Sequence, residues 1–394
     1  MNESKMTIAI DIRLVGKNRT GDETVFFHLT KELLKLDKIN RYLLLTDETR
    51  IAKVAALYAK LECIGQTNAE IVSLSAGNRF VWNLFVLPRY LFQNRIDIFH
   101  TQYILPFFSP RRTKIITHIH DVSFRAHPTF IRWSDRLFLS LLIPSSLRKA
   151  ALIIAPSQFT KNEIIRYYGI PEEKIAVIPN STGELFLENV AGNQEKTDAL
   201  REKYGLPEQF VLSVGTLQPR KNIPFLIHAF ALLQKRLPEM KLVIVGNRQA
   251  YHTDPEIETA VATRGLRQAV IFPGFVDQDD LPAVIRLARI FAFPSLYEGF
   301  GIPLLEAMSQ SVPVAASALP SLQEIGGDAA LYFDPTSIAN CEEKLYTLCT
   351  HPLQRETLQR AGKERIKLFS WRRSALLLLD AYRKITRTQT EETQ

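Results

Sequence analysis

The stretch Ala288-Arg-Ile-Phe-Ala-Phe-Pro-Ser-Leu-Tyr-Glu-Gly-Phe-Gly-Ile-Pro-Leu-Leu-Glu-Ala-Met308 decides the fold predicted for this chain. Its first six residues are mostly apolar and are typical of a buried strand. Pro303 suits the first position of a helix, because the N–H that proline lacks would have no partner there. A strand, a glycine loop and a helix therefore follow one another directly, as in a doubly wound α/β domain.

The loop in this stretch has the chemistry of a ligand site. Gly299 and Gly301 let the backbone approach a ligand, and the helix start offers free N–H groups to an anion. Glu298 in the loop and Glu306, expected in the first helical turn, can accept hydrogen bonds from sugar hydroxyls. A turn glycine and a glutamate that stabilises the helix dipole would explain only part of this pattern. The loop therefore predicts a ligand that carries both hydroxyls and phosphate.

Two further strand ends in the first half are candidates for a site. An apolar strand over residues 6–11 leads through a loop with Gly16 and Gly21 to an amphipathic helix expected over residues 24–36. This loop is not a G-x-G-x-x-G fingerprint, so no dinucleotide site is implied. The strand over residues 114–120 ends in His120-Asp121, at the edge where parallel sheets bind ligands. His118, two residues earlier, is expected to be a core histidine.

In the second half, a strand over residues 210–215 is followed by Thr216-Leu-Gln-Pro-Arg-Lys-Asn222 and a helix. Arg220 and Lys221 lie side by side before a helix start, which suits a diphosphate better than a merely solvated surface. The acids at residues 277, 279 and 280 directly precede another helix. We expect them to cap this helix and oppose its dipole, and not to form a metal site.

Together these motifs resemble the retaining glycosyltransferases of family 4, which contain two glutamates separated by seven residues, here Glu298 and Glu306. The resemblance covers nearly the whole chain and implies the α/β fold called GT-B, in which two doubly wound Rossmann-like domains face a central cleft. We expect an N-terminal, acceptor-side domain over residues 1–185 and a polar linker over 186–204. A nucleotide-sugar-binding domain over 205–369 and a C-terminal helix over 370–387 that returns to the first domain would complete the chain.

The resemblance also implies the site residues. The donor-binding residues would be Gly21, Gly215, Thr216, Arg220, Lys221, Gly274, Phe275, Val276, Glu298, Gly299, Phe300, Gly301, Ile302 and Glu306. The catalytic residues would be Glu298, His120, Lys221 and Arg220. Two positions depart from the family pattern: Asp22-Glu23 replace a glycine and a basic residue, and Thr216 stands where an arginine is common. Arg220 would supply the missing charge.

The implied activity is transfer of a hexose from a nucleotide sugar, with retention of configuration, to a glycan or lipid-linked glycan. Glu306 would hold the ribose, Glu298 the transferred sugar, and His120 would orient that sugar. GDP-mannose is favoured over UDP-sugars because Pro219-Arg-Lys-Asn222 resembles mannosyltransferases. No cofactor and no metal are expected. The alternatives are a non-catalytic nucleotide-sugar-binding protein, or a sugar phosphorylase or epimerase of the same fold.

Composition limits the other classes of function. The 394 residues are 46% hydrophobic and suffice for two domains, and no apolar run is long enough to cross a bilayer. Three cysteines at unrelated spacings form neither a disulfide framework nor a metal site, which favours a reducing cytoplasm. No nucleic-acid-binding motif is present, so nucleic acid is not an expected partner.

Charge is unevenly distributed. Residues 1–185 contain 25 lysines and arginines against 17 acids, whereas the rest contains 24 of each. This excess suggests an anionic membrane surface as a partner, with the protein peripheral on the inner face. The residues that suggest it are Arg79, Arg89, Arg95, Arg111, Arg112, Arg132, Arg136, Phe80, Trp82, Phe85, Phe92, Phe130 and Trp133. Packing of the segment 80–92 on its own sheet, with a basic but solvated surface, is the alternative.

Overall fold

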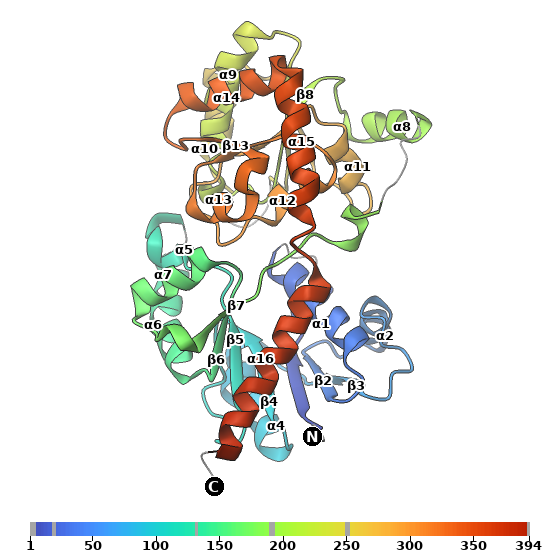
Figure 1. Ribbon diagram of the computed structural model, residues 1–394, viewed down its shortest axis with the longest axis vertical. Helices are drawn as coiled ribbons and strands as arrows, with labels where there is room; N and C mark the ends of the chain where they lie inside the picture. Colours follow the sequence, from blue (N-terminus) through green and yellow to red (C-terminus); the bar gives the residue numbers. More distant parts are fainter. Residues whose placement is uncertain (1–4, 18–20, 131–132, 189–193, 249–252, 392–394) are drawn as a thin grey trace. The chain divides into compact units, whose positions relative to one another are not determined.

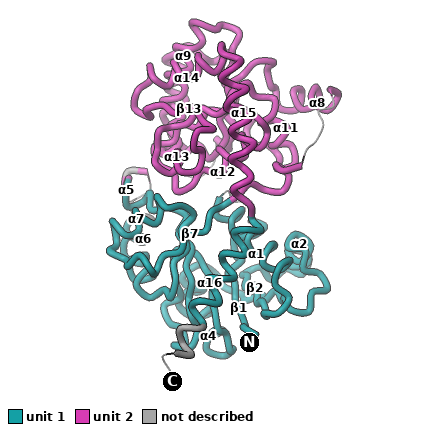
Figure 2. Tube along the Cα trace, viewed as in Figure 1, with its two compact units in different colours: residues 1–126, 132–180, 371–394 teal, residues 127–131, 181–370 magenta. Residues whose placement is uncertain are grey.

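The computed structural model describes residues 5–17, 21–130, 133–188, 194–248 and 253–391. The chain divides into two compact units (Figure 2). Unit 1 comprises the described residues within 1–126, 132–180 and 371–394, and unit 2 those within 127–131 and 181–370. Apart from the short segment 127–131, the chain enters unit 2 after residue 180 and returns to unit 1 at Trp371.

Unit 1 is built on a parallel sheet with the strand order β3-β2-β1-β4-β5-β6-β7 (Figure 1). The strands are β1 (Thr7–Asp11), β2 (Arg41–Thr46), β3 (Ala69–Ser73), β4 (Ile98–Gln102), β5 (Lys114–His118), β6 (Leu152–Ala155) and β7 (Ile175–Val177). The longer helices are α1 (Asp22–Leu36), α2 (Ile51–Lys60), α4 (Leu87–Gln93), α6 (Trp133–Lys149), α7 (Gln158–Tyr168) and α16 (Trp371–Glu391). The short helices are α3 (Arg79–Val81), the π-helix η1 (Trp82–Val86), α5 (Ser123–Ala126) and the 3₁₀ turn Glu172–Lys174.

Unit 2 contains a second parallel sheet, with the order β10-β9-β8-β11-β12-β13. Its strands are β8 (Phe210–Val214), β9 (Lys241–Val245), β10 (Val270–Gly274), β11 (Ile290–Phe293), β12 (Val314–Ser317) and β13 (Ala330–Phe333). The α-helices are α8 (Gln194–Tyr204), α9 (Ile223–Arg236), α10 (Glu256–Thr263), α11 (Leu281–Arg286), α12 (Ile302–Ser309), α13 (Pro320–Gly326), α14 (Ile338–Thr350) and α15 (Pro352–Ile366). The 3₁₀ turns are Pro128–Phe130, Glu184–Phe186, Pro219–Lys221 and Gly327–Ala329.

The apolar runs of unit 2 are buried on both faces of its sheet. Val211 packs into one core cluster with residues of α9, α10 and α14, whereas its neighbours Phe210 and Leu212 pack into a second cluster with residues of α11 and α12. Successive side chains of a strand point to opposite faces, so a strand covered by helices on both sides must be apolar throughout. The predicted doubly wound α/β fold is confirmed.

In each sheet, one position marks the reversal of strand order. The chain builds outward from β1 through β2 to β3 and then crosses to β4 on the other side of β1; in unit 2 the corresponding pair is β8 and β11. Ligands of doubly wound sheets bind outside the carboxyl ends of the strands at such a switch point. The topology therefore selects two places: the ends of β1 and β4, and the ends of β8 and β11.

Helix α16 is part of unit 1 and packs along α1 (Figure 1). At its start, Trp371 stacks on His28 of α1 with ring centroids 5.3 Å apart. Further along, the hydroxyl of the fully buried Tyr382 lies 2.7 Å from Nδ1 of His100 on β4. This hydrogen bond links the last helix of the chain to the middle of the sheet.

The segment predicted as a linker contains ordered structure that belongs to unit 2. Helix α8 occupies residues 194–204, and its Leu200 and Tyr204 are buried beside Phe186 and Leu206. The remaining residues of α8 are largely polar, so this segment has too little apolar periodicity to predict a helix. Residues 189–193 lie outside the described part of the chain.

The aromatic segment at residues 80–92 is buried on one side and exposed on the other. Trp82, Leu87 and Leu91 are buried against unit 1, whereas Phe85 and Phe92 are 66% and 55% exposed. Trp82 was grouped with the membrane-facing residues, and this prediction is wrong because its ring is fully buried and covered by the guanidinium of Arg13 at 4.3 Å.

No helix within the described ranges is long and apolar enough to cross a membrane. The three cysteines, Cys63, Cys341 and Cys349, are free thiols and all are buried.

The Tyr382–His100 hydrogen bond gives a test of how α16 is held. Tyr382→Phe should lower the free energy of unfolding of unit 1 by about 1–2 kcal/mol, because it leaves a buried imidazole nitrogen without its partner. Scanning calorimetry measures this change. Lys384→Gln, on the exposed side of the same helix, removes a surface ion pair with Asp380 and should have little effect. Equal effects of the two substitutions would contradict the assigned role.

Candidate functional site

The switch point of unit 2 gathers the residues of the two predicted loops. Strand β8 ends before Gly215-Thr216, and the 3₁₀ turn Pro219–Lys221 then precedes α9. Strand β11 ends before the loop that contains Glu298 and precedes α12. The backbone N–H of Leu296 donates to the carbonyl of Arg220 at 2.8 Å, so the two loops are joined directly.

The centre of this site is a buried ion pair. Nζ of Lys221 lies 2.5 Å from Oε1 of Glu298, and a guanidinium nitrogen of Arg220 lies 3.2 Å from Oε2. The hydroxyl of Ser295 donates to Oε1 of Glu298 at 2.7 Å. Lys221 also lies 5.2 Å from the ring centroid of Phe293, a cation–π distance. The structure therefore brings together three of the four predicted catalytic residues. It adds Ser295, for which the sequence predicted no role.

Glu298 is held in its charged form. Burial alone would raise the pKa of this carboxyl group, but the charges of Lys221 and Arg220 and the hydrogen bonds from Lys221 and Ser295 outweigh burial and lower the pKa to about 2. Its stabilising interactions are therefore complete above pH 4.5 and are lost only as the pH falls toward 2. At neutral pH the site contains one carboxylate between two cations.

Glycines allow close backbone contacts at this edge of the sheet. Gly215 donates to the carbonyl of Val245, and Gly246 donates to the carbonyl of Gly274, each at 3.0 Å. A Cβ at Gly246 would lie 2.3 Å from the carbonyl oxygen of Gly215, so no larger residue fits without moving the Gly215 loop. Gly246 was not predicted as a site residue, because the contact depends on strand pairing that a single sequence does not reveal.

Helix α12 begins at the second predicted loop. Its N-cap is Gly301 at φ = 101°, and a Cβ there would lie 2.6 Å from Leu322. Glu306 was predicted to lie in the first turn of α12. It is the fifth residue of this helix and therefore lies in the second turn. No hydrogen bond or ion pair from the described residues reaches its carboxylate, and burial raises the pKa of Glu306 to about 7. An unpaired acid at this position is a candidate ligand for hydroxyl donors.

The other predicted donor-binding residues differ in exposure and in the groups that could contact a ligand. Phe275 is exposed beyond the end of β10, whereas Val276 is buried in the core. Phe300 is buried and packs edge-on against Phe369, so only its backbone can face a ligand. The hydroxyl of Thr216 is buried and has no hydrogen-bond partner among the described residues. Gly299 and Ile302 lie between Glu298 and the first turn of α12.

The prediction that the acids before α11 cap this helix by their side chains is wrong in its contacts. Asp280 is the N-cap residue but makes no side-chain capping bond. Instead, the carboxylates of Asp277 and Asp280 each lie 2.8 Å from Nζ of Lys203 on α8 and also accept from the hydroxyl of Tyr204. These acids therefore attach α8 to unit 2. No group of acids, histidines and cysteines suited to a metal occurs in the described ranges.

The remaining predicted residues, Gly21 and His120, lie in unit 1 at its own switch point. Nε2 of His120, which follows β5, lies 3.0 Å from Oε1 of Gln102 at the end of β4. The same Nε2 is 3.8 Å from a carboxylate oxygen of Asp22, the first residue of α1. Asp121 accepts hydrogen bonds from Ser123 and so forms the turn that follows His120.

His118 is a core residue, as predicted. Its ring is fully buried and stacks between those of His100 and His120, at centroid distances of 6.1 and 4.6 Å. Burial lowers the pKa of His118 and of His100, so both rings are neutral at physiological pH. They support the ring of His120 from within the unit.

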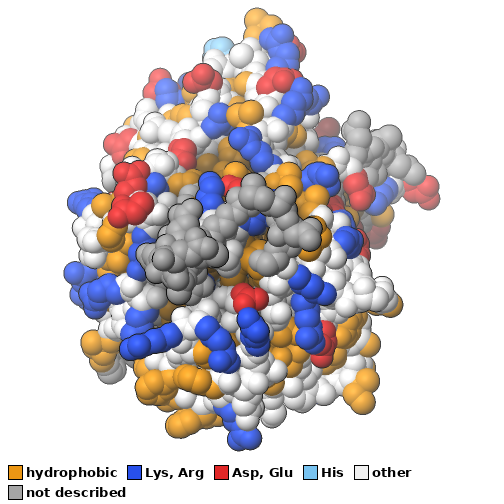
Figure 3. All heavy atoms as spheres, turned by 60° about the horizontal axis from the view of Figure 1, so that its bottom comes forward, with side chains coloured by type: hydrophobic (Ala, Val, Ile, Leu, Met, Phe, Trp, Pro, Cys, Tyr) orange, Lys and Arg blue, Asp and Glu red, His pale blue; other side chains and the backbone are white. Residues whose placement is uncertain are grey.

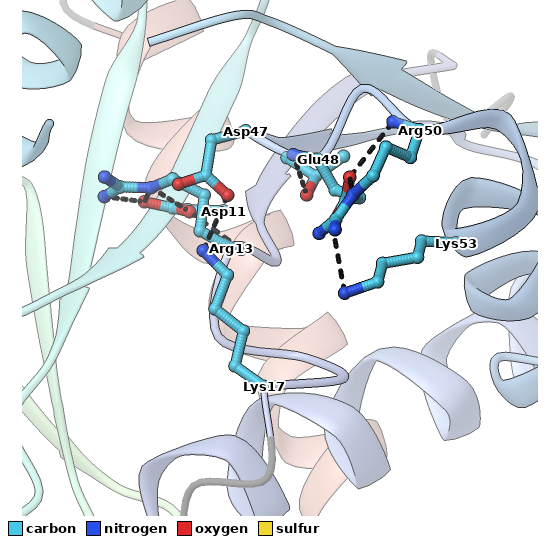
Figure 4. Close-up of polar contacts among 8 residues, drawn as sticks. Asp11, Arg13, Lys17, Asp47, Glu48, Arg50 and Lys53 are labelled. Atoms are coloured by element: carbon cyan, nitrogen blue, oxygen red, sulfur yellow. Dashed lines mark hydrogen bonds and ion pairs between the residues drawn. The ribbon is translucent and has the colours of Figure 1, made fainter. Parts of the chain in front are cut away.

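Charged residues at the ends of β1 and β2 are paired with one another (Figure 4). Arg13 binds Asp11 through two nitrogens, at 2.9 and 2.7 Å, and Lys17 lies 2.7 Å from Asp47. Beyond them, Arg50 binds Glu48 through two nitrogens. The cations in this region are thus each engaged with a carboxylate, and Lys53 shares Glu48 with Arg50.

Known protein families match both units. Residues 196–365 match the family of glycosyl transferases group 1, and residues 21–182 match glycosyltransferase family 4. O-antigen chain mannosyltransferase B of Escherichia coli is 31% identical over 289 residues, which cover 70% of this chain and 72% of that protein. The chain belongs to the group 1, family 4 glycosyltransferases.

This glycosyltransferase is also similar to a longer mannosyltransferase in sequence and to a solved structure in fold. The serotype-specific mannosyltransferase WbdA of Escherichia coli is 32% identical over 252 residues, 63% of this chain but only 30% of that longer protein. In structure, the chain resembles Anabaena Alr3699/HepE, crystallised with UDP and glucose, at a TM-score of 0.71 and 19% identity, covering 95% of this chain and 99% of that one. The structural likeness supports the GT-B fold of the glycosyltransferase.

The half-buried Glu306 gives a pH-dependent prediction. Because its pKa is raised from 4.5 to about 7, the folded protein retains this proton to a higher pH than the unfolded chain does. Stability therefore falls as the pH rises from 4.5 through 7, and the loss is complete above 7. Glu306→Gln should raise the melting temperature relative to the native protein at pH 8 but not at pH 4.5.

Thermal denaturation at the two pH values measures this difference. Glu343→Gln, at an exposed position of α14 in the same unit, makes the same chemical change and should have no such effect. If Glu306→Gln fails to stabilise the protein at pH 8, its carboxylate is not held in an unfavourable environment.

Proposed function

We propose that this glycosyltransferase transfers a hexose, with retention of anomeric configuration, from a nucleotide sugar to a glycan or lipid-linked glycan in polysaccharide biosynthesis. The observation that carries the proposal is the pairing of Lys221 and Arg220 with one buried carboxylate at the switch point of unit 2. Mannose and GDP-mannose are favoured because the relatives include O-antigen chain mannosyltransferases and because Pro219-Arg-Lys-Asn222 has the form found in mannosyltransferases.

The ion pair suggests how the donor enters. A nucleotide diphosphate offers Lys221 and Arg220 more negative charge than Glu298 does, so the cations can turn to the phosphates. Glu298 then becomes available to the hydroxyls of the transferred sugar. The backbone N–H groups at the start of α12 add to the positive potential. Glu306, whose carboxylate has no partner among the described residues, would accept hydrogen bonds from the ribose hydroxyls.

The same residues can stabilise the transition state. The bond between the anomeric carbon and the diphosphate oxygen breaks, leaving an oxocarbenium-like sugar and a more negative phosphate. The acceptor hydroxyl oxygen bonds to the anomeric carbon on the face that the phosphate leaves, and its proton passes to the departing phosphate oxygen. Lys221 and Arg220 meet the charge that develops on the phosphate. His120 orients the sugar and takes no proton in this scheme.

Binding and turnover of GDP-mannose test the donor site. Glu298→Gln should lower turnover roughly 100-fold with a smaller effect on donor affinity, because its charge is most needed as the sugar becomes cationic. Calorimetry with GDP and GDP-mannose gives affinity, and release of mannose to water or an acceptor gives turnover. We expect activity to persist in EDTA, since the acids at 277 and 280 are engaged with Lys203.

Glu343→Gln again serves as the matched control. Normal affinity and normal turnover in Glu298→Gln would mean that the site is misassigned. Loss of activity in EDTA, restored by Mg²⁺ or Mn²⁺, would show that the metal-independent mechanism is wrong.

We further propose that unit 1 attaches reversibly to an anionic membrane surface. Val81, Phe85, Arg89 and Phe92 are exposed on one side of the continuous helix formed by α3, η1 and α4. The loop with Phe108, Arg111 and Arg112 lies against this helix: Phe107 donates to the carbonyl of Asn83, and Arg112 to those of Phe92 and Asn94. We call these seven exposed residues the aromatic–arginine face.

Several observations support this proposal. On the face of the molecule that Figure 3 brings forward, basic side chains lie beside hydrophobic ones. Arg79 extends the aromatic–arginine face by stacking on Phe138 of α6, where Leu137 and Leu141 are exposed. Aromatic rings with flanking arginines suit the interface of a bilayer that contains anionic lipids. Of the residues first considered, Arg132 lies outside the described part, and Phe130 belongs to unit 2.

Co-sedimentation with liposomes tests the membrane proposal. The protein should sediment with phosphatidylglycerol-containing vesicles at low salt, less at high salt, and little with phosphatidylcholine alone, because salt screens the attraction. Replacing Phe85 and Phe92 by serine should reduce binding. Replacing Ile51 and Ile64, also strongly exposed in unit 1, is the matched control and should not. Binding without preference for anionic vesicles would contradict the proposal.

A further inference from the structure

We propose that Ser295 is a positioning residue for Glu298: its hydroxyl keeps the carboxylate in place and charged after the donor phosphates have attracted the two cations away from it. This inference rests on the proposed transferase function and deepens it, because it names the contact that remains with Glu298 while Lys221 and Arg220 exchange partners. Ser295 is then needed for turnover and not for binding of the donor.

The geometry around Ser295 is fixed by its loop. Ser295 lies between the end of β11 and Glu298 and is completely buried. Its hydroxyl donates to Oε1 of Glu298 at 2.7 Å, the same oxygen that lies 2.5 Å from Nζ of Lys221. The next residue, Leu296, donates its backbone N–H to the carbonyl of Arg220 at 2.8 Å. A buried hydroxyl on a backbone held in this way has few orientations, so the direction of its hydrogen bond is set before a ligand binds.

The contacts of Glu298 differ in how they respond to a diphosphate. Lys221 and Arg220 are cations, and a diphosphate carries more negative charge than one carboxylate does, so it attracts them more strongly. Ser295 has no charge, and its loop holds it in place, so a phosphate does not draw it away. When the cations turn to the donor, Ser295 therefore stays hydrogen-bonded to Glu298.

This remaining hydrogen bond has two effects on Glu298. Burial acts to raise the pKa of the carboxyl group, and the charges of Lys221 and Arg220, with the hydrogen bonds from Lys221 and Ser295, lower the pKa to about 2. Once the cations are bound to phosphate, the hydroxyl still favours the charged form, because it donates to a carboxylate. It also fixes Oε1, so that Oε2, the oxygen released by Arg220, accepts from a hydroxyl of the sugar.

Steady-state transfer from GDP-mannose by Ser295→Ala tests this role. The variant should lower kcat roughly tenfold, because a misplaced carboxylate stabilises the cationic sugar less well. Its Kd for GDP-mannose, measured by calorimetry, should change less than about twofold, since the lost hydrogen bond exists both with and without the donor. The acid limb of the kcat profile should move up by about one pH unit, because Glu298 loses a contact that favours its charge.

Ser317→Ala is the matched control. Ser317 ends the neighbouring strand β12 and is equally buried, and its hydroxyl has no hydrogen-bond partner in the described part of the chain. Removing this hydroxyl should change neither kcat nor the pH profile. A double-mutant cycle with Glu298→Gln gives a second check: if Ser295 acts through Glu298, the double variant should be about as slow as Glu298→Gln alone.

The outcomes separate this inference from the proposed function. The inference alone is overturned if Ser295→Ala keeps the kcat and the pH profile of the native enzyme, or if Ser317→Ala slows transfer equally. It is also overturned if the loss appears in donor affinity and not in kcat, or if the effects of Ser295→Ala and Glu298→Gln add in full. Failure of the proposed function looks different: the native enzyme would then not turn over GDP-mannose, or Glu298→Gln would be as active as the native enzyme.

Discussion

The ion pair between Lys221 and Glu298 is the interaction on which the proposed donor site depends. Each charge is buried, so removing one would leave the other uncompensated in a medium of low polarity, which is far more costly than losing a surface salt bridge. Ser295 and Arg220 complete the shell of the carboxylate. The loops after β8 and β11 are therefore held in place before any ligand binds. A donor that binds must therefore supply free energy for the exchange of ion-pair partners, but not for ordering the loops.

The same folding rule produces two sites of different electrostatic character. Both units place a strand reversal at the centre of a parallel sheet, and both bring polar side chains to the carboxyl ends of the two strands involved. In unit 2, two cations bind one carboxylate, and we propose that they also bind the diphosphate of the donor. In unit 1, Arg13 is matched by Asp11, and His120 has uncharged or acidic neighbours. Topology thus decides where ligands bind, and side-chain charge decides which ligands they are.

The sequence predicted what depends on local pattern and failed where distant segments meet. The strand, loop and helix around Glu298 could be predicted because apolar runs, glycines and Pro303 each have a local physical meaning. Gly246 could not be predicted, because glycine is required there by the carbonyl oxygen of Gly215, which follows the neighbouring strand β8. The acids at 277 and 280 were misassigned because Lys203 and Tyr204, their partners, lie more than 70 residues away. Helix α8 was missed because only its buried Leu200 and Tyr204 have an apolar role.

Two residues with left-handed backbone conformations lie close in sequence to the ion pair. Asn222 directly follows Lys221 and has a left-handed φ of 57°, and Gly301, three residues after Glu298, has a φ of 101°. These are the N-cap residues of α9 and α12, so each helix starts with a sharp change of direction that leaves the preceding charged side chain facing the other loop. For asparagine this conformation is unfavourable, but its side chain donates to the carbonyl of Pro335 and compensates in part. The left-handed Asn222 and the carboxylate of Glu306, which has no partner among the described residues, thus occur together at the site, and the buried core on both faces of the sheet provides the stability that maintains them.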